Sequence, residues 1–576
     1  MKKRSVKVLM ALVLAALLSC FAMAAFAQGY SLKIGGQEVK GDNLVIHGGS
    51  GTATYDPAKN ILTLDHFTYE GDQDGIYYYR WDDVKMPMNI VLKGSNKIAA
   101  ASTNGIRVSA DLIFSGEGSL NVSAKQYAVD VLDGGIEIKD SVELNAAATD
   151  SYAYAIFTQG ELIISDKAQV NADSTYMAVE ACSGIDLSDQ VKLVANASEY
   201  GLFVNGGDVK VEDSAVLEAI GKNTTGTGIL ADSGLTVSGK GKIVAKGGYF
   251  GVRANNGCVS VKDLAVLEAE ASKYEYAYGI YSADFVVSGN ARVNVFGVEY
   301  GVLSGKDIIV KDSAELNVAS NGGPYGAAIQ CNEEIVASGK AKVTATGAYR
   351  GINSWSGTAT VQDDACVTAE VKKTSGERYG LYVNELKVLG GTLEITCPSL
   401  EEGSYAVYSR NKIVIADDLG MLIPQDGKVG EKIVTGEGYW FAYYFIEDAD
   451  GNAADHVRIA THYGVNIKGD ADAEGISLDK LSATVGEKVT VTITPAEGNV
   501  LESLLVNGKD VTDEISNGMY TFDMPNENVV IEVKWAKESS VVALPRTGDN
   551  SHMALWLMLL GMAGAGVMTL RKRAHH

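Results

Sequence analysis

Carboxylates are the side chains of this chain best suited to chemistry, and their spacing limits what they could do. Paired aspartates occur three times in the repeat region, far apart in sequence, at Asp82-Asp83, Asp363-Asp364 and Asp417-Asp418. No histidine lies between His66 and His456 to act beside them as a general base. A site of carboxylates alone stays open, but no cluster of acids assembles one. We therefore predict no catalytic residues and no cofactor.

A second series of aspartates recurs at one place of the repeat, in successive repeats up to Asp213 and in every second repeat after it. Its members are Asp140, Asp166, Asp189, Asp213, Asp263, Asp312 and Asp363. Glycines alternate with the later aspartates, at Gly239, Gly289, Gly339 and Gly390. Because aspartate and glycine interchange as turn residues, we interpret the series as structural.

One short segment partly resembles a calcium-binding loop. It reads Asp448-Ala449-Asp450-Gly451-Asn452, but the bidentate glutamate that should follow is missing. A plain Asp-Gly turn explains these residues better, so we predict no metal site. The sequence also lacks a phosphate loop, a nucleophile elbow and an HExxH motif.

Aromatic residues recur in a step of tyrosine, then glycine or alanine, then an aliphatic residue. Clear copies are Tyr200-Gly201-Leu202, Tyr278-Gly279-Ile280, Tyr300-Gly301-Val302, Tyr325-Gly326-Ala327 and Tyr379-Gly380-Leu381. Strand alternation places the tyrosine on the same side as the aliphatic residue, which predicts a stack of rings pointing inward or lying at a corner.

The residue two places beyond each glycine or alanine should point to the opposite, outer side. Aromatic residues occupy this place at Phe157, Phe203, Tyr281, Tyr382 and Tyr408. Sugar rings stack on aromatic faces, so we predict these five side chains as a ligand platform for a polysaccharide. Scattered surface aromatics without a function are the alternative.

The elements that carry these residues are short strands with a period of two, repeated every 22–30 residues. This pattern fits a right-handed parallel β-helix of about 13–14 coils over residues 75–416. It does not fit a leucine-rich repeat, because the L-x-x-L-x-L frame is absent. Residues 28–74 and 417–460 should cap the two ends. The expected fold class is therefore all-β. The fold resembles that of pectin lyases and polygalacturonases, which makes a polysaccharide lyase or hydrolase an alternative function.

Residues 461–535 carry four further strand signals, including VTVTITP and VVIEVKW. The frame resembles the small Ig-like or grasp-like β-repeats of bacterial surface proteins. This resemblance implies a spacer domain of β-sandwich or grasp-like type, joined to the C-terminal segment by a linker at 536–543.

The N-terminus predicts export. Basic residues precede an apolar run that ends at Ala25-Phe26-Ala27, so residues 1–27 read as a signal peptide cleaved between Ala27 and Gln28. A lipoprotein signal at Leu18-Ser19-Cys20 is the alternative.

The C-terminal segment, residues 544–576, has three parts. These are Leu544-Pro545-Arg546-Thr547-Gly548, an apolar stretch at 553–570 and the basic group Arg571-Lys572-Arg573. The segment resembles the LPXTG sorting signal of Gram-positive surface proteins. The resemblance implies that a sortase attacks the Thr547 carbonyl, releases Gly548 onward and joins Thr547 to peptidoglycan. An ordinary transmembrane anchor is the alternative.

The charge and the cysteines narrow the function further. The formal net charge is −23; without residues 1–27 and 548–576, which hold seven basic residues and one acidic residue, it is −29. Such a surface repels nucleic acid. Cys182, Cys258, Cys331, Cys366 and Cys397 follow the signal peptide at unequal repeat positions, which argues against a disulfide ladder.

Together these features predict a secreted, wall-anchored surface protein that displays a binding surface without catalysis. Its partners would be a sortase, peptidoglycan and a polysaccharide or host-surface ligand. A purely structural rod is a further alternative.

Overall fold

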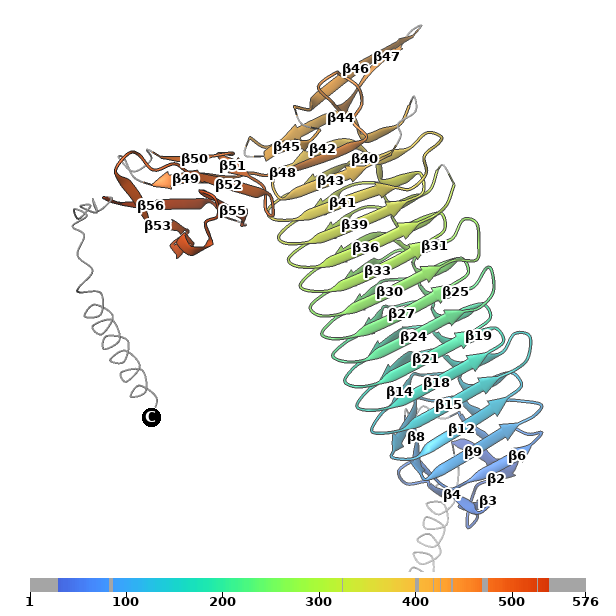
Figure 1. The fold of residues 1–576 in the computed structure, drawn as a ribbon. Helices are drawn as coiled ribbons and strands as arrows, with labels where there is room; N and C mark the ends of the chain where they lie inside the picture. Colours follow the sequence, from blue (N-terminus) through green and yellow to red (C-terminus); the bar gives the residue numbers. More distant parts are fainter. Residues whose placement is uncertain are drawn as a thin grey trace, which may run out of the picture. The chain divides into compact units, whose positions relative to one another are not determined.

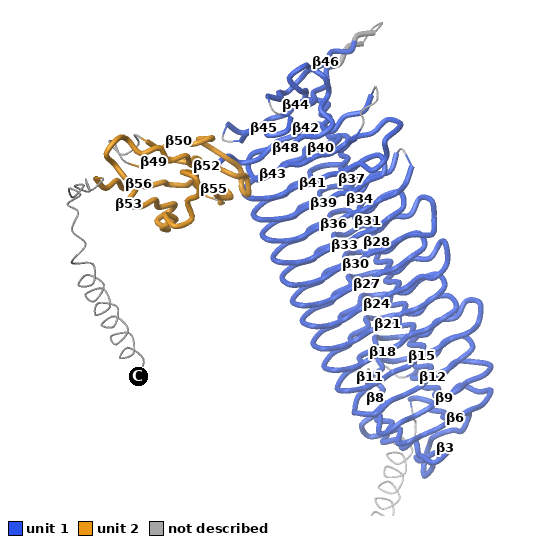
Figure 2. Tube along the Cα trace, viewed as in Figure 1, with its two compact units in different colours: residues 1–462 blue, residues 463–576 orange. Residues whose placement is uncertain are grey.

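The computed structural model describes residues 29–81, 86–323, 325–398, 403–417, 419–424, 426–436, 439–468, 475–525 and 527–537. Two compact units divide the chain between His462 and Tyr463 (Figure 2). The first unit is a parallel β-solenoid of about fourteen coils, built from three stacks of strands (Figure 1). Nearly all of the regular secondary structure in the described residues is strand, so the predicted all-β class and β-helix are confirmed.

Stack 1 opens each coil. Its strands are β7 (Ile76–Arg80), β10 (Ile106–Val108), β13 (Tyr127–Val131), β16 (Tyr154–Thr158), β19 (Met177–Ala181), β22 (Tyr200–Val204), β25 (Thr227–Ala231), β28 (Phe250–Ala254), β31 (Tyr278–Ser282), β34 (Tyr300–Ser304), β37 (Ala327–Cys331) and the first parts of β40 (Arg350–Val361), β42 (Tyr379–Val388) and β44 (Tyr405–Ile415). Neighbouring strands pair in parallel, one coil to the next.

Stack 2 follows stack 1 in each coil and is also parallel. It comprises β5 (Ile61–Asp65), β8 (Met88–Lys93), β11 (Leu112–Gly116), β14 (Ile136–Ile138), β17 (Glu161–Ile164), β20 (Gly184–Leu187), β23 (Val209–Val211), β26 (Leu235–Val237), β29 (Cys258–Val261), β32 (Asp284–Val287), β35 (Ile308–Val310), β38 (Ile335–Ala337) and the later parts of β40, β42 and β44.

Stack 3 completes the coil. It comprises β6 (Thr68–Gly71), β9 (Ser95–Ala100), β12 (Ser119–Ala124), β15 (Glu143–Ala148), β18 (Gln169–Ser174), β21 (Lys192–Ala197), β24 (Val216–Gly221), β27 (Lys242–Gly247), β30 (Val266–Ala271), β33 (Arg292–Gly297), β36 (Glu315–Ser320), β39 (Lys342–Gly347), β41 (Cys366–Val371) and β43 (Thr392–Thr396). Its strands again pair in parallel between coils.

The interior of the solenoid is one continuous apolar column. Leu235, Val237, Ile243 and Ala245 fall on one side of their strands, as their spacing predicts, and none of them is exposed to solvent. Each coil buries its apolar row against the coils on either side, which is how repeat proteins gain stability that a single coil would lack.

Antiparallel strands cover both ends of the solenoid. At the N-terminal end these are β1 (Tyr30–Ile34), β2 (Gln37–Glu38), β3 (Val45–Gly48) and β4 (Gly51–Asp56). β1 pairs with β7 and β4 pairs with β5. Strands β5 and β6 already pair in parallel with β8 and β9, so the parallel stacks begin at Ile61. Such caps remove the edges to which another chain could add.

The C-terminal end of the solenoid carries β45 (Leu419–Ile423), β46 (Lys428–Gly436), β47 (Tyr439–Glu447) and β48 (His456–Thr461). β48 pairs antiparallel with β43, and β47 pairs antiparallel with β44. Both pairings end a parallel stack with a strand of opposite direction.

The second unit has its own core. Its elements are β49 (Tyr463–Lys468), β50 (Ile476–Leu478), β51 (Ser482–Ala483), β52 (Lys488–Ile493), β53 (Asn499–Val506), β54 (Lys509–Asp510), the short 3₁₀ helix η1 (Thr512–Glu514), β55 (Met519–Asp523) and β56 (Val529–Lys537). They form a five-stranded sheet in the order β51-β49-β56-β53-β54 and a three-stranded sheet in the order β50-β52-β55.

Candidate functional site

The repeated tyrosine step bends the chain at a corner of the solenoid. Gly201 and Leu202 are both buried, whereas Tyr200 and Phe203 on either side of them are half-buried. A Cβ atom on Gly201 would lie 2.5 Å from the backbone nitrogen of Ile220 in stack 3. Two consecutive residues therefore face inward here, and strict strand alternation does not hold.

This corner corrects the predicted direction of the tyrosine rings. The aliphatic residue after each glycine or alanine belongs to the apolar column, but the preceding aromatic ring does not, even where, as for Phe250 and Tyr379, it is buried. Instead, that ring contacts the aromatic residue three places further on. The rings of Tyr200 and Phe203 are 5.7 Å apart, and those of Tyr278 and Tyr281 are 6.4 Å apart. Both positions thus lie on the outer side.

The outer side of stack 1 consequently carries two parallel rows of side chains, which we call the aromatic face. The first row runs through Tyr127, Tyr154, Met177, Tyr200, Thr227, Phe250, Tyr278, Tyr300 and Ala327, and then through Arg350, Tyr379 and Tyr405. The second row runs through Arg107, Asp130, Phe157, Glu180, Phe203, Leu230, Arg253, Tyr281, Leu303, Gln330, Asn353, Tyr382 and Tyr408.

All five predicted platform residues lie in the second row, and all five are half-buried. They are Phe157, Phe203, Tyr281, Tyr382 and Tyr408. The residues that interrupt them are Glu180, Leu230, Arg253, Leu303, Gln330 and Asn353. Together with the first-row rings, the five therefore belong to three clusters and not to one continuous strip.

The first cluster surrounds Phe157. Tyr127 and Tyr154 stack face to face, with ring centroids 5.0 Å apart and planes at 6°. Phe157 meets both rings edge-on at 5.9 Å. Burial raises the pKa of Tyr154 to about 12, so its phenol stays protonated and can donate a hydrogen bond.

The central cluster contains a cation. Phe250, Tyr278 and Tyr300 stack in series at 5.1 and 5.4 Å. The Arg253 guanidinium carbon lies 4.8 Å from the Phe250 ring centroid and 6.0 Å from that of Tyr281. Guanidinium groups favour such positions over ring faces, so this cluster presents both apolar faces and a hydrogen-bond donor.

The third cluster lies at the C-terminal end of the solenoid. Tyr382 stacks on Tyr408 at 4.8 Å and 12°, and Tyr408 stacks on Tyr443 of β47 at 4.9 Å. Trp355 is 53 % exposed and lies 5.8 Å from Tyr382. The cap strand therefore extends the face beyond the last coil.

Sequence reasoning missed two buried carboxylates in the second row. Asp130 is 1 % exposed and its carboxylate lies 3.1 Å from the Arg107 guanidinium. Burial raises the pKa of Asp130 to about 6, although Arg107 lowers it. Burial also raises the pKa of Glu180. The sequence could have indicated them, because Asp130 and Glu180 stand two places beyond Ala128 and Ala178, the same repeat position as the predicted aromatic residues.

The step at Tyr325-Gly326 does not hold the place that its letters suggest. Tyr300 pairs with Ala327, and Val302 pairs with Ile329. Tyr325 therefore precedes the row by two residues, and its side chain is 74 % exposed. The pairing between coils, and not the Tyr-Gly motif, determines which residue enters the face.

The aspartate series forms turns, as predicted. Each of the seven aspartates has a positive φ, between 55° and 64°. All seven of their carboxylates hold the same turn in the preceding coil: the backbone N–H groups of Asp140, Asp166 and Gly239 donate to Asp166, Asp189 and Asp263 at 2.9–3.1 Å. In the remaining hydrogen bonds, the backbone N–H groups of Gly116, Asp189, Gly289 and Gly339 donate to the carboxylates of Asp140, Asp213, Asp312 and Asp363, respectively.

The other polar candidates also have local roles. The Asp448 carboxylate accepts hydrogen bonds from the backbone N–H groups of Asp450 and Asn452, as a turn requires. Across the described ranges, no group of three or more His, Cys, Asp or Glu side chains is placed to hold a metal ion. The five cysteines after the signal peptide are free thiols.

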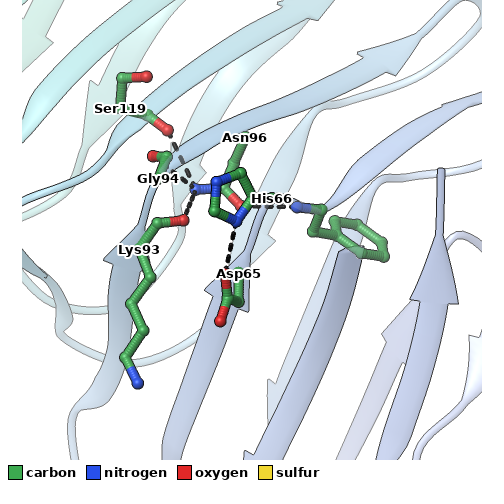
Figure 3. A network of polar contacts seen from close by, with 7 residues as sticks. Asp65, His66, Lys93, Gly94, Asn96 and Ser119 are labelled. Atoms are coloured by element: carbon green, nitrogen blue, oxygen red, sulfur yellow. Dashed lines mark hydrogen bonds and ion pairs between the residues drawn. The ribbon is translucent and has the colours of Figure 1, made fainter. Parts of the chain in front are cut away.

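His66 belongs to a polar network near the N-terminal cap (Figure 3). Its Nδ1 lies 2.6 Å from the Asp65 carboxylate. Beside it, buried Asn96 accepts from the Phe67 N–H and donates to the carbonyls of Lys93, Gly94 and Ser119. The amide satisfies backbone groups of several turns at once, which is a structural role.

Several predicted positions lie outside the described residues. These are the signal cleavage site at Ala27-Gln28, the doublet Asp82-Asp83, Asp418, and the sorting residues Leu544, Pro545, Thr547 and Gly548. Among the residues that the structure does describe, none forms a helix long and apolar enough to span a membrane.

Comparison with known proteins adds no further assignment. Neither a protein-family model, nor a curated protein, nor a solved structure matches this chain.

Proposed function

We propose that this chain is a secreted surface protein, anchored to a Gram-positive cell wall, whose aromatic face binds glycan without cleaving it. The observation that carries the proposal is the second row of stack 1. It presents half-buried aromatic rings in three clusters, with polar side chains between them. Sugar rings need such apolar faces for stacking and such polar neighbours for their hydroxyl groups.

The stacked coils suit a long ligand. Successive coils lie roughly 4.8 Å apart, so the aromatic face repeats its contacts at a spacing close to the length of one hexose ring in an extended chain. A polymer could therefore contact several clusters together, and each further contact would raise the overall affinity.

Wall anchoring is supported by the sequence at both ends. The signal peptide predicts export, and the LPXTG motif with its apolar and basic segments predicts transfer to peptidoglycan at Thr547. The second unit would then act as the spacer that separates the solenoid from the wall. The partners in this proposal are a sortase, peptidoglycan and a glycan of another surface.

The glycan proposal is tested with a glycan and plant-polysaccharide array, using residues 28–535. We expect binding to one class of polysaccharide, and no new reducing ends or unsaturated products from any hit. Product formation would replace the binding proposal with a lyase or hydrolase. No binding, with display on the wall intact, would favour a structural rod.

The anchoring proposal is tested separately with Thr547→Ala. The resemblance to the LPXTG signal implies that the sortase recognises the threonine side chain, which the variant loses although it keeps the backbone carbonyl. The variant should therefore be found in the membrane or the medium and be absent from the peptidoglycan fraction. Arg546→Ala, at the variable place of the motif, is the matched control and should still be linked. Normal wall linkage of the threonine variant would contradict the proposal.

A further inference from the structure

Three consecutive coils of the aromatic face place a carboxylate between two aromatic rings. Phe157 of β16 pairs with Glu180 of β19, which pairs with Phe203 of β22. All three side chains belong to the second row, so they follow one another along the solenoid axis. The charged group thus lies between two apolar rings, where ordinary packing would favour another apolar residue.

Glu180 has no internal partner. It is only 9 % exposed, yet its carboxylate makes no hydrogen bond or ion pair with any other residue that the structure describes. Burial of a carboxylate without compensating donors is costly, and native proteins rarely leave such groups unsatisfied. Asp130, two coils away in the same row, differs because Arg107 forms an ion pair with it at 3.1 Å, although that carboxylate oxygen is enclosed and makes no hydrogen bond. The carboxylate oxygens of Glu180 are not among the fully enclosed polar atoms that lack a partner, so a donor from outside the chain, either water or a ligand hydroxyl group, can reach them.

The two phenylalanines restrict the shape of a ligand that could supply this donor. Phe157 and Phe203 are two coils apart, roughly 10 Å at the usual strand spacing. This distance is close to the length of two hexopyranose units in an extended β-1,4-linked chain. Alternate sugar rings could therefore stack on the two phenylalanines while the ring between them offers its hydroxyl groups to Glu180.

Charge restricts the ligand further. The nearest cations in the second row are Arg107 and Arg253, each three coils from Glu180. Arg107 is paired with Asp130, and Arg253 lies over the rings of Phe250 and Tyr281. The whole chain carries a net charge of −23. A polymer with a carboxylate or sulfate on each unit would meet repulsion from Glu180 and from the surrounding surface, whereas a neutral polymer would not.

We propose that Phe157, Glu180 and Phe203 form a subsite for an extended, neutral β-1,4-linked glycan that runs along the solenoid axis. Phe157 and Phe203 stack on alternate sugar rings, and Glu180 accepts hydrogen bonds from hydroxyl groups of the ring between them. This inference rests on the proposed glycan-binding function and assigns it a ligand class and a place in the fold.

The test is isothermal titration of the purified full-length chain with β-1,4-linked hexaoses of glucose, mannose and N-acetylglucosamine. Maltohexaose, which is α-linked and curved, and an oligogalacturonate, which is anionic, serve as comparison ligands. We expect at least one β-1,4-linked hexaose to bind at least tenfold more tightly than either comparison ligand. Tighter binding of the oligogalacturonate would overturn the inference.

Two variants locate the subsite. Glu180→Gln keeps the size of the side chain but loses the charge and one acceptor, and should weaken binding at least fivefold. Phe203→Ala removes one stacking ring and should weaken binding at least tenfold. Glu218→Gln, which removes a carboxylate paired with Lys192 on stack 3, is the matched control and should leave affinity unchanged. Circular dichroism checks that each variant is folded.

The outcomes separate this inference from the broader function. If Glu180→Gln and Phe203→Ala bind as tightly as the unchanged protein while Tyr382→Ala does not, the subsite is wrong and glycan binding by the face stands. If no glycan binds the unchanged protein, both proposals fail.

Discussion

Two features of the solenoid repeat coil by coil, and they differ in how their polar groups are satisfied. In the turn series, each aspartate carboxylate accepts a backbone N–H of the preceding coil. In the aromatic face, half-buried rings contact one another, and Glu180 has no partner in the described part of the chain. Regular repetition alone therefore does not identify a function.

The comparison predicts that the turn series contributes to stability and not to binding. Asp166→Val places a β-branched side chain at a φ of 63° and removes the acceptor of the Asp140 N–H. Strain and the lost hydrogen bond should together lower the free energy of unfolding by about 3–4 kcal/mol. Urea denaturation followed by circular dichroism measures the loss.

Asp166→Gly is the matched control for backbone strain. Glycine adopts a positive φ without cost, and glycine already occupies the equivalent turn at Gly239 and Gly289. We expect this variant to lose about 1 kcal/mol, the share of the hydrogen bond. If both variants lose the same free energy of unfolding, backbone strain at this turn is not the main cause of the loss in Asp166→Val.

The buried carboxyl group of Asp130 should make the protein less stable as the pH rises from 4 to 6. Its pKa rises from 3.8 to about 6 because the carboxyl group is buried. Between these values the folded protein holds a proton that the unfolded chain releases, so stability is greater below pH 4 and falls as the pH rises to 6. The contribution of this group to the fall should be on the order of 2–3 kcal/mol.

Asp130→Asn should remove that contribution. Urea midpoints measured between pH 4 and 7 should fall less steeply for the variant than for the unchanged protein, while Glu218→Gln on stack 3 should leave the slope unaltered. A variant with the original slope would show that other groups produce the pH dependence.

The turn series could be predicted from sequence because the cause is local. A single turn position requires a positive φ, and only a few residue types accept it, so the exchange of aspartate and glycine reveals the turn without knowledge of the fold. The coil period and the buried face of strands such as β26 and β27 were predictable for the same reason, because alternation within a regular strand is a property of the backbone.

The direction of the rings could not be predicted in this way. The rule of alternation fails at the corner, where Gly201 and Leu202 both face inward because the chain turns towards stack 3. The prediction that Tyr325 occupies the tyrosine position of the step was wrong for a related reason. Pairing with the neighbouring coil, and not the local Tyr-Gly motif, sets the register. The isolation of Glu180 depends on residues from three coils, so no local pattern records it.

Removal of one ring should test the outward position of the aromatic face. Tyr278 stacks between Phe250 and Tyr300 but lies outside the core. Tyr278→Ala should lower the free energy of unfolding by about 1–2 kcal/mol, and Tyr278→Phe, which keeps the ring, by much less. A loss above about 3 kcal/mol in urea denaturation is typical of core residues and would contradict an outer position.

A third repeated feature, a row of asparagine side chains on stack 3, should contribute least to the free energy of unfolding. On the outer side of stack 3, the Asn145 side-chain amide donates to Asn121 at 3.0 Å, and that of Asn171 donates to Asn145 at 2.7 Å. These groups are exposed, so water can replace each bond when a partner is removed. The next residue in the same row is Val194, so the coil accepts an apolar side chain there.

Asn145→Ala should therefore change the free energy of unfolding by no more than about 0.5 kcal/mol and leave glycan affinity unaltered. A larger loss of stability in urea denaturation would show that the amide row supports the stack as the aspartate turns do. A loss of affinity would instead place the glycan on stack 3, on a different side of the coil from Phe157 and Phe203. The least sensitive of the three repeated features is thus the one that separates a ligand bound on stack 1 from a ligand bound elsewhere on the solenoid.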